Sequence, residues 1–415
     1  MNLPPVARFL RVVYKLGPLM FSLLLFRKTH RGKEPTPKEK QKLQKQGKKL
    51  FESLVDLGPA FIKLGQILSV RPDVVPPEYI KELERLQDDV PPAPFEEVRK
   101  LIESELGALE HVFESFDGEP VASASLGQVY KAVYKGEQVA VKVNRPGIAE
   151  VVKRDAQVLK LLLSVLGVLV DRNIAGIMRS LVDEYSSRIT REVDYKIEAN
   201  NMSIIKKELA HQKDVVVPTV FQEVSTGKVL VMSYHGGVKI SDVAGLDANG
   251  IDRQRLARRL SRIYLEMVLG QPLFHADPHP GNIAVGAQGE IILYDYGMVG
   301  SLDDYTRKHV VRLYAAMAAY DPASIVDELY ELGALDPAAD RTVIEKGFEL
   351  SLRELRGQTV SQWEIRRLRE LADRMISEFP FRLPEELVLY MRMATILESV
   401  CTTLDPSFRF VRVMS

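Results

Sequence analysis

Residues 275–297 read HADPHPGNIAVGAQGEIILYDYG, and this stretch carries the pattern that decides the fold. It contains the motif H-x-D-x-x-x-x-N at His275, Asp277 and Asn282, and D-Y-G follows with Asp295 thirteen residues after the asparagine. A short apolar run, IILY, separates the motifs and predicts a strand. Phosphoryl transfer needs this combination, because one carboxylate positions the nucleophile while an amide and a second carboxylate hold a metal ion against the phosphates. Either motif alone arises often by chance, but the two in this order predict one joint site.

The segment upstream predicts a nucleotide-binding strand pair. Residues 138–142 read QVAVK and end in Lys142, which matches the strand lysine of protein kinases that contacts the α- and β-phosphates. A turn at Lys135 and Gly136 predicts a hairpin ahead of it. Where kinases have a loop of pattern G-x-G-x-x-G-x-V, alanine replaces two glycines here; alanine disfavours positive φ and should stiffen the loop. The loop residues predicted to contact nucleotide are Ala122, Ser123, Ala124, Ser125, Gly127, Gln128 and Val129.

Four features give the chain a specific resemblance from about residue 40 to about residue 410. They are the alanine-rich loop, a K-x-G-Q element (Lys63, Gly65, Gln66), the run LQDDVPP at 86–92, and REVDYKIEANN at 191–201 with Glu192, Asp194 and Glu198. With the HADPHPGN and DYG motifs, they make the chain similar to the UbiB family. That family comprises atypical, protein-kinase-like proteins associated with coenzyme Q and other isoprenoid lipids.

The motifs and the resemblance together assign roles to individual residues. Asp277 is expected to orient the acceptor hydroxyl or water, and Asn282 and Asp295 are expected to hold Mg²⁺ for bound ATP or ADP. The resemblance implies that Lys142 pairs with Glu198 and that Glu192 and Asp194 interact with Lys63 and Gln66 near the nucleotide. It also makes GKVLVMSYHGG similar to a kinase hinge, so Met232 and Tyr234 are expected beside the adenine.

Several of these residues also have a purely structural or surface interpretation. Glu198 could be a solvated helix acid, and Glu192 and Asp194 could be surface charges. Lys63 and Gln66 lie on one helix face at i and i+3, where they could reach one partner, but Gly65 between them also suits plain helix packing. His275 and His279 are interpreted as structural loop residues rather than metal ligands.

The expected fold is α+β and two-lobed like a protein kinase, with a small β-sheet N-lobe and a helical C-lobe. Four segments are predicted: a basic apolar leader at 1–36, a helical K-x-G-Q extension at 37–110, an N-lobe with a helical insertion at 111–234, and a C-lobe at 235–415. The insertion is predicted to contain a helix at 155–170 and a second from about 175, both added to the N-lobe. Strands are expected at 215–224 and 228–234.

Composition and charge suggest where the protein acts. Residues 1–50 contain thirteen Lys/Arg and two acidic residues, a net charge of +11 in a chain whose total is zero. In the leader, Arg8, Arg11 and Lys15 flank apolar residues, which indicates contact with anionic or isoprenoid lipids at a membrane surface. A solvated helix face is the alternative, and nucleic acid is disfavoured because no aromatic residues are interleaved with the lysines. A single cysteine suits a reducing compartment, and no uninterrupted apolar run reaches the roughly 18 residues expected of a membrane span.

These observations predict a kinase-like ATPase or phosphotransferase that binds Mg-ATP. It is expected to be cytoplasmic and peripheral on the cytoplasmic face of a membrane, without a transmembrane helix, and to serve quinone or isoprenoid-lipid metabolism, with quinone-biosynthesis proteins as possible partners. A small-molecule kinase of the choline or aminoglycoside type is one alternative, because HPGN resembles its catalytic loop. A nucleotide-sensing scaffold with little turnover is the other.

Overall fold

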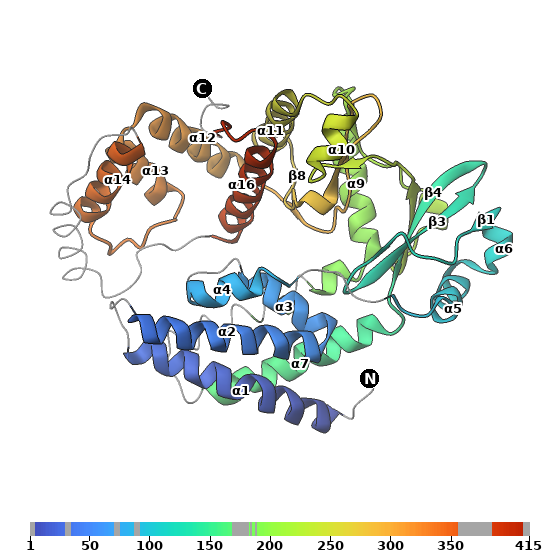
Figure 1. The fold of residues 1–415 in the computed structure, drawn as a ribbon, viewed down its shortest axis with the longest axis horizontal. Coiled ribbons are helices and arrows are strands. Elements are labelled where there is room, and N and C mark those ends of the chain that lie inside the picture. Colours follow the sequence, from blue (N-terminus) through green and yellow to red (C-terminus); the bar gives the residue numbers. More distant parts are fainter. Residues whose placement is uncertain are drawn as a thin grey trace. The chain divides into compact units, whose positions relative to one another are not determined.

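The computed structural model describes residues 5–29, 35–69, 75–86, 92–167, 182, 185–186, 189–355 and 384–409. The chain divides into two compact units (Figure 1). Unit 1 contains residues 1–200 and 219–234, and unit 2 contains residues 201–218 and 235–415.

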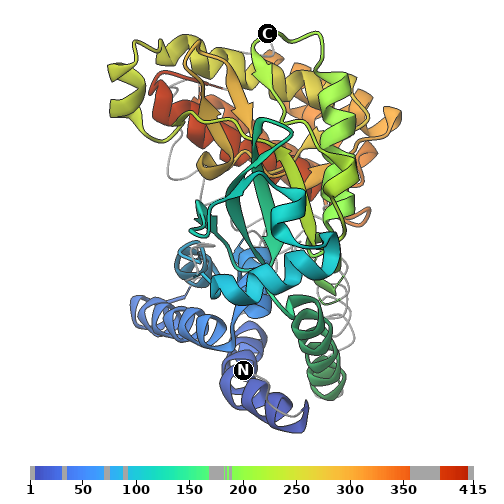
Figure 2. The ribbon, with the colours of Figure 1, turned by 90° about the vertical axis from the view of Figure 1, so that its right-hand side faces the viewer.

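Unit 1 contains an antiparallel sheet of five strands. The strands are β1 (Ser115–Phe116), β2 (Ala122–Ser123), β3 (Gly127–Tyr134), β4 (Glu137–Asn144) and β6 (Val229–Ser233), in the order β1-β3-β4-β6 with β2 beside β3. The predicted hairpin turn is present: Lys135 (φ 51°) and Gly136 (φ 77°) are both left-handed, as a two-residue turn between twisted strands requires. Helices α5 (Phe95–Leu106) and α6 (Leu109–Val112) cover one face of the sheet (Figure 2). Val98 and Ile102 belong to the same buried core as Tyr130 and Val141.

The N-terminal helices of unit 1 form a second core. It contains α1 (Pro5–Thr29), α2 (Pro37–Leu57), α3 (Pro59–Ser69), α4 (Pro77–Leu83) and α7 (Ile148–Gly167). Helix α2 begins with a capping box in which Thr36 and Glu39 bond to each other's backbone N–H groups, and it ends at Gly58 (φ 98°). Helix α7 is the predicted insertion helix; it starts seven residues earlier than expected and contacts α1 and α3 in this core. The second predicted insertion helix and residues 87–91 of the LQDDVPP run lie outside the described residues.

Unit 2 is mainly helical around two small sheets. Strands β5 (Val215–Val216), β10 (Ile291–Leu293), β9 (Ile283–Val285) and β7 (Val238–Lys239) form one sheet in this order, and β8 (Phe274–His275) pairs with β11 (Val299–Gly300). The helices are α10 (Val243–Ala248), α11 (Arg253–Gly270), α12 (Asp304–Ala319), α13 (Pro322–Glu331), α14 (Arg341–Leu355) and α16 (Glu385–Leu404). Helix α9 (Tyr195–Glu208) begins in unit 1 and ends in unit 2. Helix is therefore the main element in the described ranges after residue 300, as the sequence predicts.

The expected strand at 215–224 differs from what the structure contains. Val215 and Val216 form the short strand β5, which pairs in parallel with β10 of unit 2, while Val220 makes an isolated antiparallel bridge with Met232 of β6 in unit 1. Pro218 follows and has no N–H to continue a ladder, and Gln222–Val224 forms a 3-10 turn, η1. Residues 201–218 accordingly belong to unit 2, although the sequence placed them with the N-lobe.

One helix among the described residues has the length and hydropathy of a membrane span: α16, over Glu386–Leu404, with 39% of that stretch buried. The sequence expectation counted only uninterrupted apolar runs and so passed over this segment, which contains Arg392 and Glu398. Core helices of soluble proteins meet the same criteria. Within unit 2, α16 packs against α11 and buries Met393, Leu397 and Cys401 at four-residue spacing.

A buried ion pair joins α1 to α7 and corrects one expectation for the leader. Arg8 donates from Nε and Nη2 to the Asp155 carboxylate at 2.8 and 2.6 Å, and from Nη2 to the Leu57 carbonyl oxygen at 2.6 Å. Both side chains are almost fully buried, so Arg8 does not face a membrane. Arg11 and Lys15 are partly exposed, but both pair with Asp56, which lowers the pKa of that carboxyl group.

Candidate functional site

The two motifs that decide the fold meet at one end of a hairpin. Strands β9 and β10 pair antiparallel with Ile283 opposite Leu293, and the Tyr294 N–H donates to the Asn282 carbonyl oxygen at 2.8 Å. Asn282 immediately precedes β9, and Asp295 follows β10 by two residues. The antiparallel ladder therefore brings the two predicted metal ligands to the same end of the hairpin.

His275 fixes the backbone of both loops from inside the core. Its side chain is fully buried, and Nδ1 shares a 3.0 Å hydrogen bond with the hydroxyl group of Tyr264 on α11. Nε2 lies 2.8 Å from the Asp295 carbonyl oxygen and 3.1 Å from that of Tyr294. Burial raises the pKa of Tyr264 well above its usual value, so the phenol stays protonated. His275 is thus a structural residue, as the sequence indicates.

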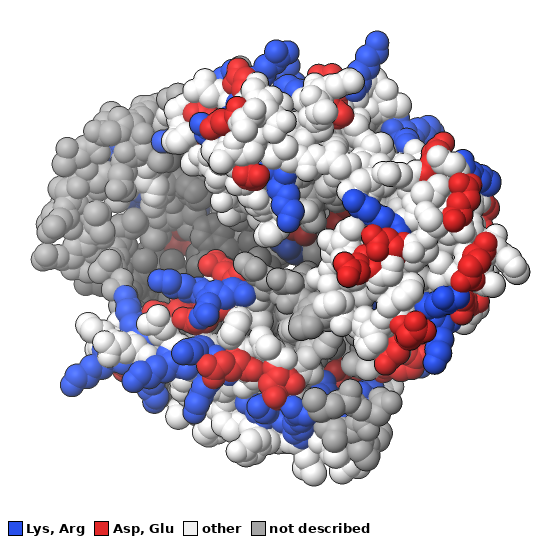
Figure 3. Space-filling view, turned by 45° about the vertical axis from the view of Figure 1, so that its right-hand side comes forward, with Lys and Arg blue, Asp and Glu red and all other residues white. Residues whose placement is uncertain are grey.

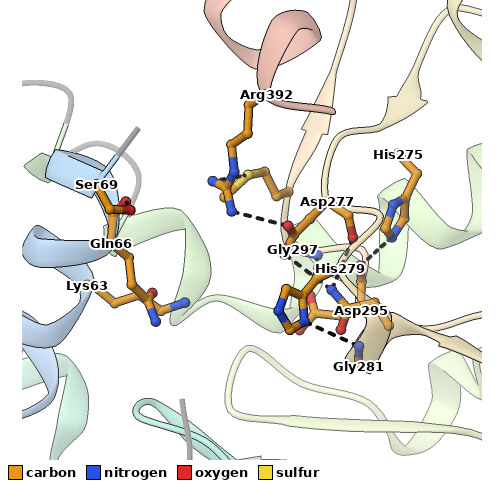
Figure 4. A network of polar contacts seen from close by, with 12 residues as sticks. Lys63, Gln66, Ser69, His275, Asp277, His279, Gly281, Asp295, Gly297 and Arg392 are labelled. Atoms are coloured by element: carbon orange, nitrogen blue, oxygen red, sulfur yellow. Dashed lines mark hydrogen bonds and ion pairs between the residues drawn. The ribbon is translucent and has the colours of Figure 1, made fainter. Parts of the chain in front are cut away.

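The predicted catalytic carboxylate is held on both of its oxygens (Figure 4). Asn282 Nδ2 donates to Asp277 Oδ2 at 3.2 Å and to the Asp277 carbonyl oxygen at the same distance. Arg392, on α16, donates from Nη2 to Asp277 Oδ1 at 3.1 Å. His279 accepts a hydrogen bond from the Gly281 N–H through Nδ1, which caps the 3-10 turn η2 (Pro280–Asn282).

Asp295 has an unusual backbone conformation. Its φ is +52°, a left-handed value that costs a non-glycine residue about 1 kcal/mol or more. Its Oδ1 accepts a hydrogen bond from the Gly297 N–H at 3.0 Å, and Asn201 on α9 donates to the neighbouring Tyr296 carbonyl oxygen at 3.0 Å. Such strain persists only where surrounding contacts fix it, and it is common at functional sites.

The ligand set fits a magnesium ion that binds together with a nucleotide. Because Asn282 uses its amide nitrogen on Asp277, its oxygen Oδ1 is the atom that suits a cation. Asp295 adds a carboxylate, and Mg²⁺ in proteins typically takes one or two such groups plus phosphate and water oxygens. Within the described ranges no group of three or more His, Cys, Asp or Glu residues forms a metal cluster.

In unit 1 the predicted lysine–glutamate pair is present. Lys142 Nζ, on β4, lies 2.8 Å from both carboxylate oxygens of Glu198, on α9. Glu198 is almost fully buried and Lys142 is mostly buried, and the Lys142 ammonium also lies 5.3 Å from the centre of the Tyr195 ring. Glu198 is therefore not a solvated helix acid, despite the 56 positions that separate it from Lys142.

An arginine that the motifs did not single out anchors the alanine-rich loop. Arg145 donates from Nε to the Ala124 carbonyl oxygen at 2.9 Å and from Nη2 to Ser123 Oγ at 3.0 Å, while its backbone N–H bonds to the Leu126 carbonyl oxygen. A Cβ at Gly127 would collide with the Tyr195 hydroxyl group and lie 2.9 Å from the Val143 carbonyl oxygen. The one glycine retained in the loop is therefore required for packing.

The other residues predicted to contact nucleotide have varied environments. Ser125 is fully buried, and Gln128 is buried with its amide bonded to the Ala93 N–H and the Tyr130 hydroxyl group. Ala122 pairs with Val129, and Met232 pairs with Ala140 on the sheet. The Tyr234 N–H donates to the Gln138 carbonyl oxygen, and its ring lies 4.5 Å from Lys131 Nζ.

The K-x-G-Q and E-x-D elements are in contact within unit 1. Lys63 Nζ lies 3.1 Å from Glu192 Oε2, with both side chains mostly buried, while Gln66 Nε2 donates to the Leu86 carbonyl oxygen at 3.1 Å. Asp194 accepts from the Lys196 N–H at 3.1 Å, at the start of α9. A Cβ at Gly65 would overlap Leu86 Cδ1 and lie 2.7 Å from Leu54 Cδ1, so this glycine has a packing role as well.

The comparisons with known proteins agree with this geometry. The profile of the ABC1 atypical kinase-like domain matches residues 85–329, more than half of the chain. The chain belongs to the ABC1 atypical kinase-like family, the ABC1/UbiB family that the motifs indicated. Its fold is therefore kinase-like, as the sequence predicted.

Similar proteins come from plants and bacteria. Activity of BC1 complex kinase 7, chloroplastic, of Arabidopsis thaliana is 35% identical over 91% of this chain and 54% of its own length. An uncharacterized Synechocystis protein, sll1770, is 34% identical over 91% of this chain and 65% of its own length. The chain thus spans about half to two thirds of these relatives. Among solved structures, Rv3197 of Mycobacterium tuberculosis, in complex with erythromycin, is 23% identical with a TM-score of 0.57, covering 82% of this chain and 87% of its own; this likeness concerns the fold alone.

Replacing Gly65 tests whether the K-x-G-Q helix is held by tight packing. We expect Gly65→Ala to lower the free energy of unfolding by about 1–3 kcal/mol, because the added methyl group overpacks the contact with Leu54 and Leu86. The matched control is Gly270→Ala at the end of α11, where no described atom lies within 4 Å of the added methyl group; there alanine should be neutral or stabilising by up to about 1 kcal/mol. Urea titration measures both, and equal stability of the two variants would contradict the packing role.

Proposed function

We propose that the chain binds Mg-ATP and transfers or hydrolyses its γ-phosphoryl group. The observation that supports this best is that both carboxylate oxygens of Asp277 accept hydrogen bonds, one from Asn282 and one from Arg392. This carboxylate lies at the end of the β9–β10 hairpin that also carries Asp295. In this proposal Asp277 orients the attacking hydroxyl or water, and Asn282 and Asp295 hold Mg²⁺ against the phosphates. The Lys142–Glu198 pair of unit 1 supplies a fixed ammonium group for the α- and β-phosphates.

Two features of unit 1 suit slow turnover. Arg145 holds the alanine-rich loop by hydrogen bonds to Ala124 and Ser123, so this loop has less freedom to close on phosphates than a glycine loop. Lys63, which the resemblance places near the nucleotide, is paired with Glu192. The alternative of a nucleotide-sensing scaffold is therefore retained as an outcome of the test below.

We propose a membrane face as the place of action, because α1 presents an apolar face outward. Val6, Leu10, Tyr14, Phe21 and Leu25 are 71, 60, 79, 61 and 52% exposed, and their spacing places them on one side of the helix. At 1.5 Å per residue this face is about 29 Å long. The opposite side is buried, with Val12, Leu16 and Leu19 in the core. An exposed apolar helix face of this length is typical of helices that lie in a bilayer interface.

Electrostatic attraction to that surface comes mainly from α2 in this proposal. The lysines of α2 are exposed: Lys38, Lys40, Lys42, Lys45, Lys48 and Lys49. Figure 3 shows such basic side chains over the N-terminal helices in its lower part, with acidic ones among them. Anionic or isoprenoid lipids on the cytoplasmic face are the proposed partners, and quinone or isoprenoid-lipid metabolism, with its biosynthetic proteins, is the proposed setting.

ATP turnover by the purified chain tests the enzymatic proposal. We expect Mg-dependent phosphate release that rises when liposomes containing anionic and isoprenoid-like lipids are added, and a loss of about 100-fold or more in Asp277→Asn. The matched control is Asp252→Asn, because Asp252 is an exposed N-cap of α11 and asparagine caps helices equally well. Tight ATP binding with a phosphate release that Asp277→Asn leaves unchanged would favour the scaffold over the enzyme.

Cosedimentation with liposomes tests the membrane-facing side of α1. Leu10→Gln and Phe21→Gln should each weaken partition onto anionic liposomes about tenfold, because each removes an apolar side chain that would be buried in lipid. Val311→Gln, at an exposed valine of α12, is the control and should have no effect. If all three variants cosediment equally with the unmodified chain, α1 does not contact the bilayer.

A further inference from the structure

The guanidinium group of Arg392 lies between the two loops of the candidate site. Its Nη2 donates to Asp277 Oδ1 at 3.1 Å, and its Nη1 lies 3.0 Å from the sulfur of Met298, the residue after the D-Y-G motif (Figure 4). The Ala276 N–H also bonds to the Met298 carbonyl oxygen at 3.0 Å, so the two contacted segments are themselves joined. Arg392 reaches this point from α16, 115 residues after Asp277.

We propose that Arg392 is the positioning residue of Asp277 and supplies the positive charge that the catalytic loop itself lacks. Residues 275–282 contain no lysine or arginine, and their two histidines are used elsewhere: His275 on Tyr264 and Asp295, His279 on the Gly281 N–H. A carboxylate that orients a nucleophile beside a triphosphate needs a cation nearby, because the negative charges repel each other. Arg392 is in place to supply it. This inference rests on the proposed phosphoryl transfer.

The hydrogen bonding of Arg392 suits a functional residue better than a structural one. Among the residues that the structure describes, its buried Nε has no hydrogen-bond partner, and its Nη1 faces a thioether, which is a weak acceptor. An arginine that serves only stability would normally have these donors satisfied, as Arg8 has on Asp155 and Leu57. Within the described part of the chain, the bond to Asp277 is the one that Arg392 makes to a strong acceptor, and 18% of its side chain remains exposed.

The backbone of Arg392 is held in place because helix α16 is packed against the core. The neighbouring Met393 is buried, and Leu397 and Cys401 continue the buried side one and two turns later. Cys401 also bonds through Sγ to the Ala257 carbonyl oxygen on α11 at 3.5 Å, and burial raises the pKa of this thiol to about 12, so it stays a neutral packing group. The carboxylate of Asp277 is thus oriented from a helix that is packed on the core of unit 2.

Steady-state kinetics of Arg392→Met test the proposal. We expect kcat for phosphate release to fall about 30-fold with KM for Mg-ATP within about twofold of the unmodified chain, because the carboxylate loses its orientation while nucleotide ligands remain. Arg392→Lys, which keeps the charge, should recover part of kcat. The matched control is Arg259→Met, since Arg259 pairs with Asp214 in the same unit; its kcat should not change.

A double-mutant cycle shows whether Arg392 acts through Asp277. In the Asp277→Asn background, Arg392→Met should cause no further loss, because the group that it positions is already gone. Unchanged kcat in Arg392→Met, or a full additional loss in the double variant, overturns the proposal. If the unmodified chain shows no phosphate release that depends on Asp277, the proposed function itself is wrong. If such phosphate release is present, a negative result with the Arg392 variants contradicts only the role of Arg392. Thermal unfolding of Arg392→Met and Arg392→Lys shows whether each measured variant is folded.

Discussion

One buried imidazole fixes the geometry on which the candidate site depends. His275 lies in the core of unit 2, bonded to Tyr264 of α11 on one side and to the Tyr294 and Asp295 carbonyl oxygens on the other. A buried polar ring with both nitrogens satisfied allows little freedom, because any displacement leaves an unpaired group in the core. Asp277 lies two residues along from this anchor, and Asp295 is held left-handed beside it. The side chains of the candidate site are thus positioned by a buried histidine with a structural role.

Much of this arrangement could be predicted from local patterns. The hairpin at 127–144 was predicted from its Lys135-Gly136 turn, and the Lys142–Glu198 pair from motif resemblance alone. Arg392 and Arg145 could not be found in this way, since they belong to no motif and act through contacts far along the chain. The same holds for Arg8: its place in a basic, apolar leader suggested lipid, but its partner Asp155 lies on an inserted helix that no local pattern connects to it. Residues 201–218 group with unit 2 for a similar reason, because β5 pairs with β10, whose residues come 76 positions later in the chain.

The N-terminal helices combine two physical roles. One side of α1 is fixed to α7 by a desolvated ion pair, while the other side leaves large apolar residues in water. Exposed apolar surface of this kind is unfavourable unless something covers it, and the adjacent lysines of α2 favour an anionic surface. The same helical core carries the K-x-G-Q element, whose Lys63 pairs with Glu192. The exposed apolar face of α1 and the Lys63–Glu192 pair therefore belong to helices that share one hydrophobic core.

The most direct test of the central claim is a metal-binding measurement in which electron paramagnetic resonance detects Mn²⁺, used in place of Mg²⁺. The account predicts that the protein immobilises Mn²⁺ only when ATP is present, because the chain offers one carboxylate and one amide and the phosphates must complete the shell. Asn282→Ala and Asp295→Asn should each weaken this binding about tenfold or more, while the remote change Asp252→Asn leaves it intact. Mn²⁺ that binds equally well in all three variants, or that stays free while ATP binds, would contradict a nucleotide–metal site at these loops.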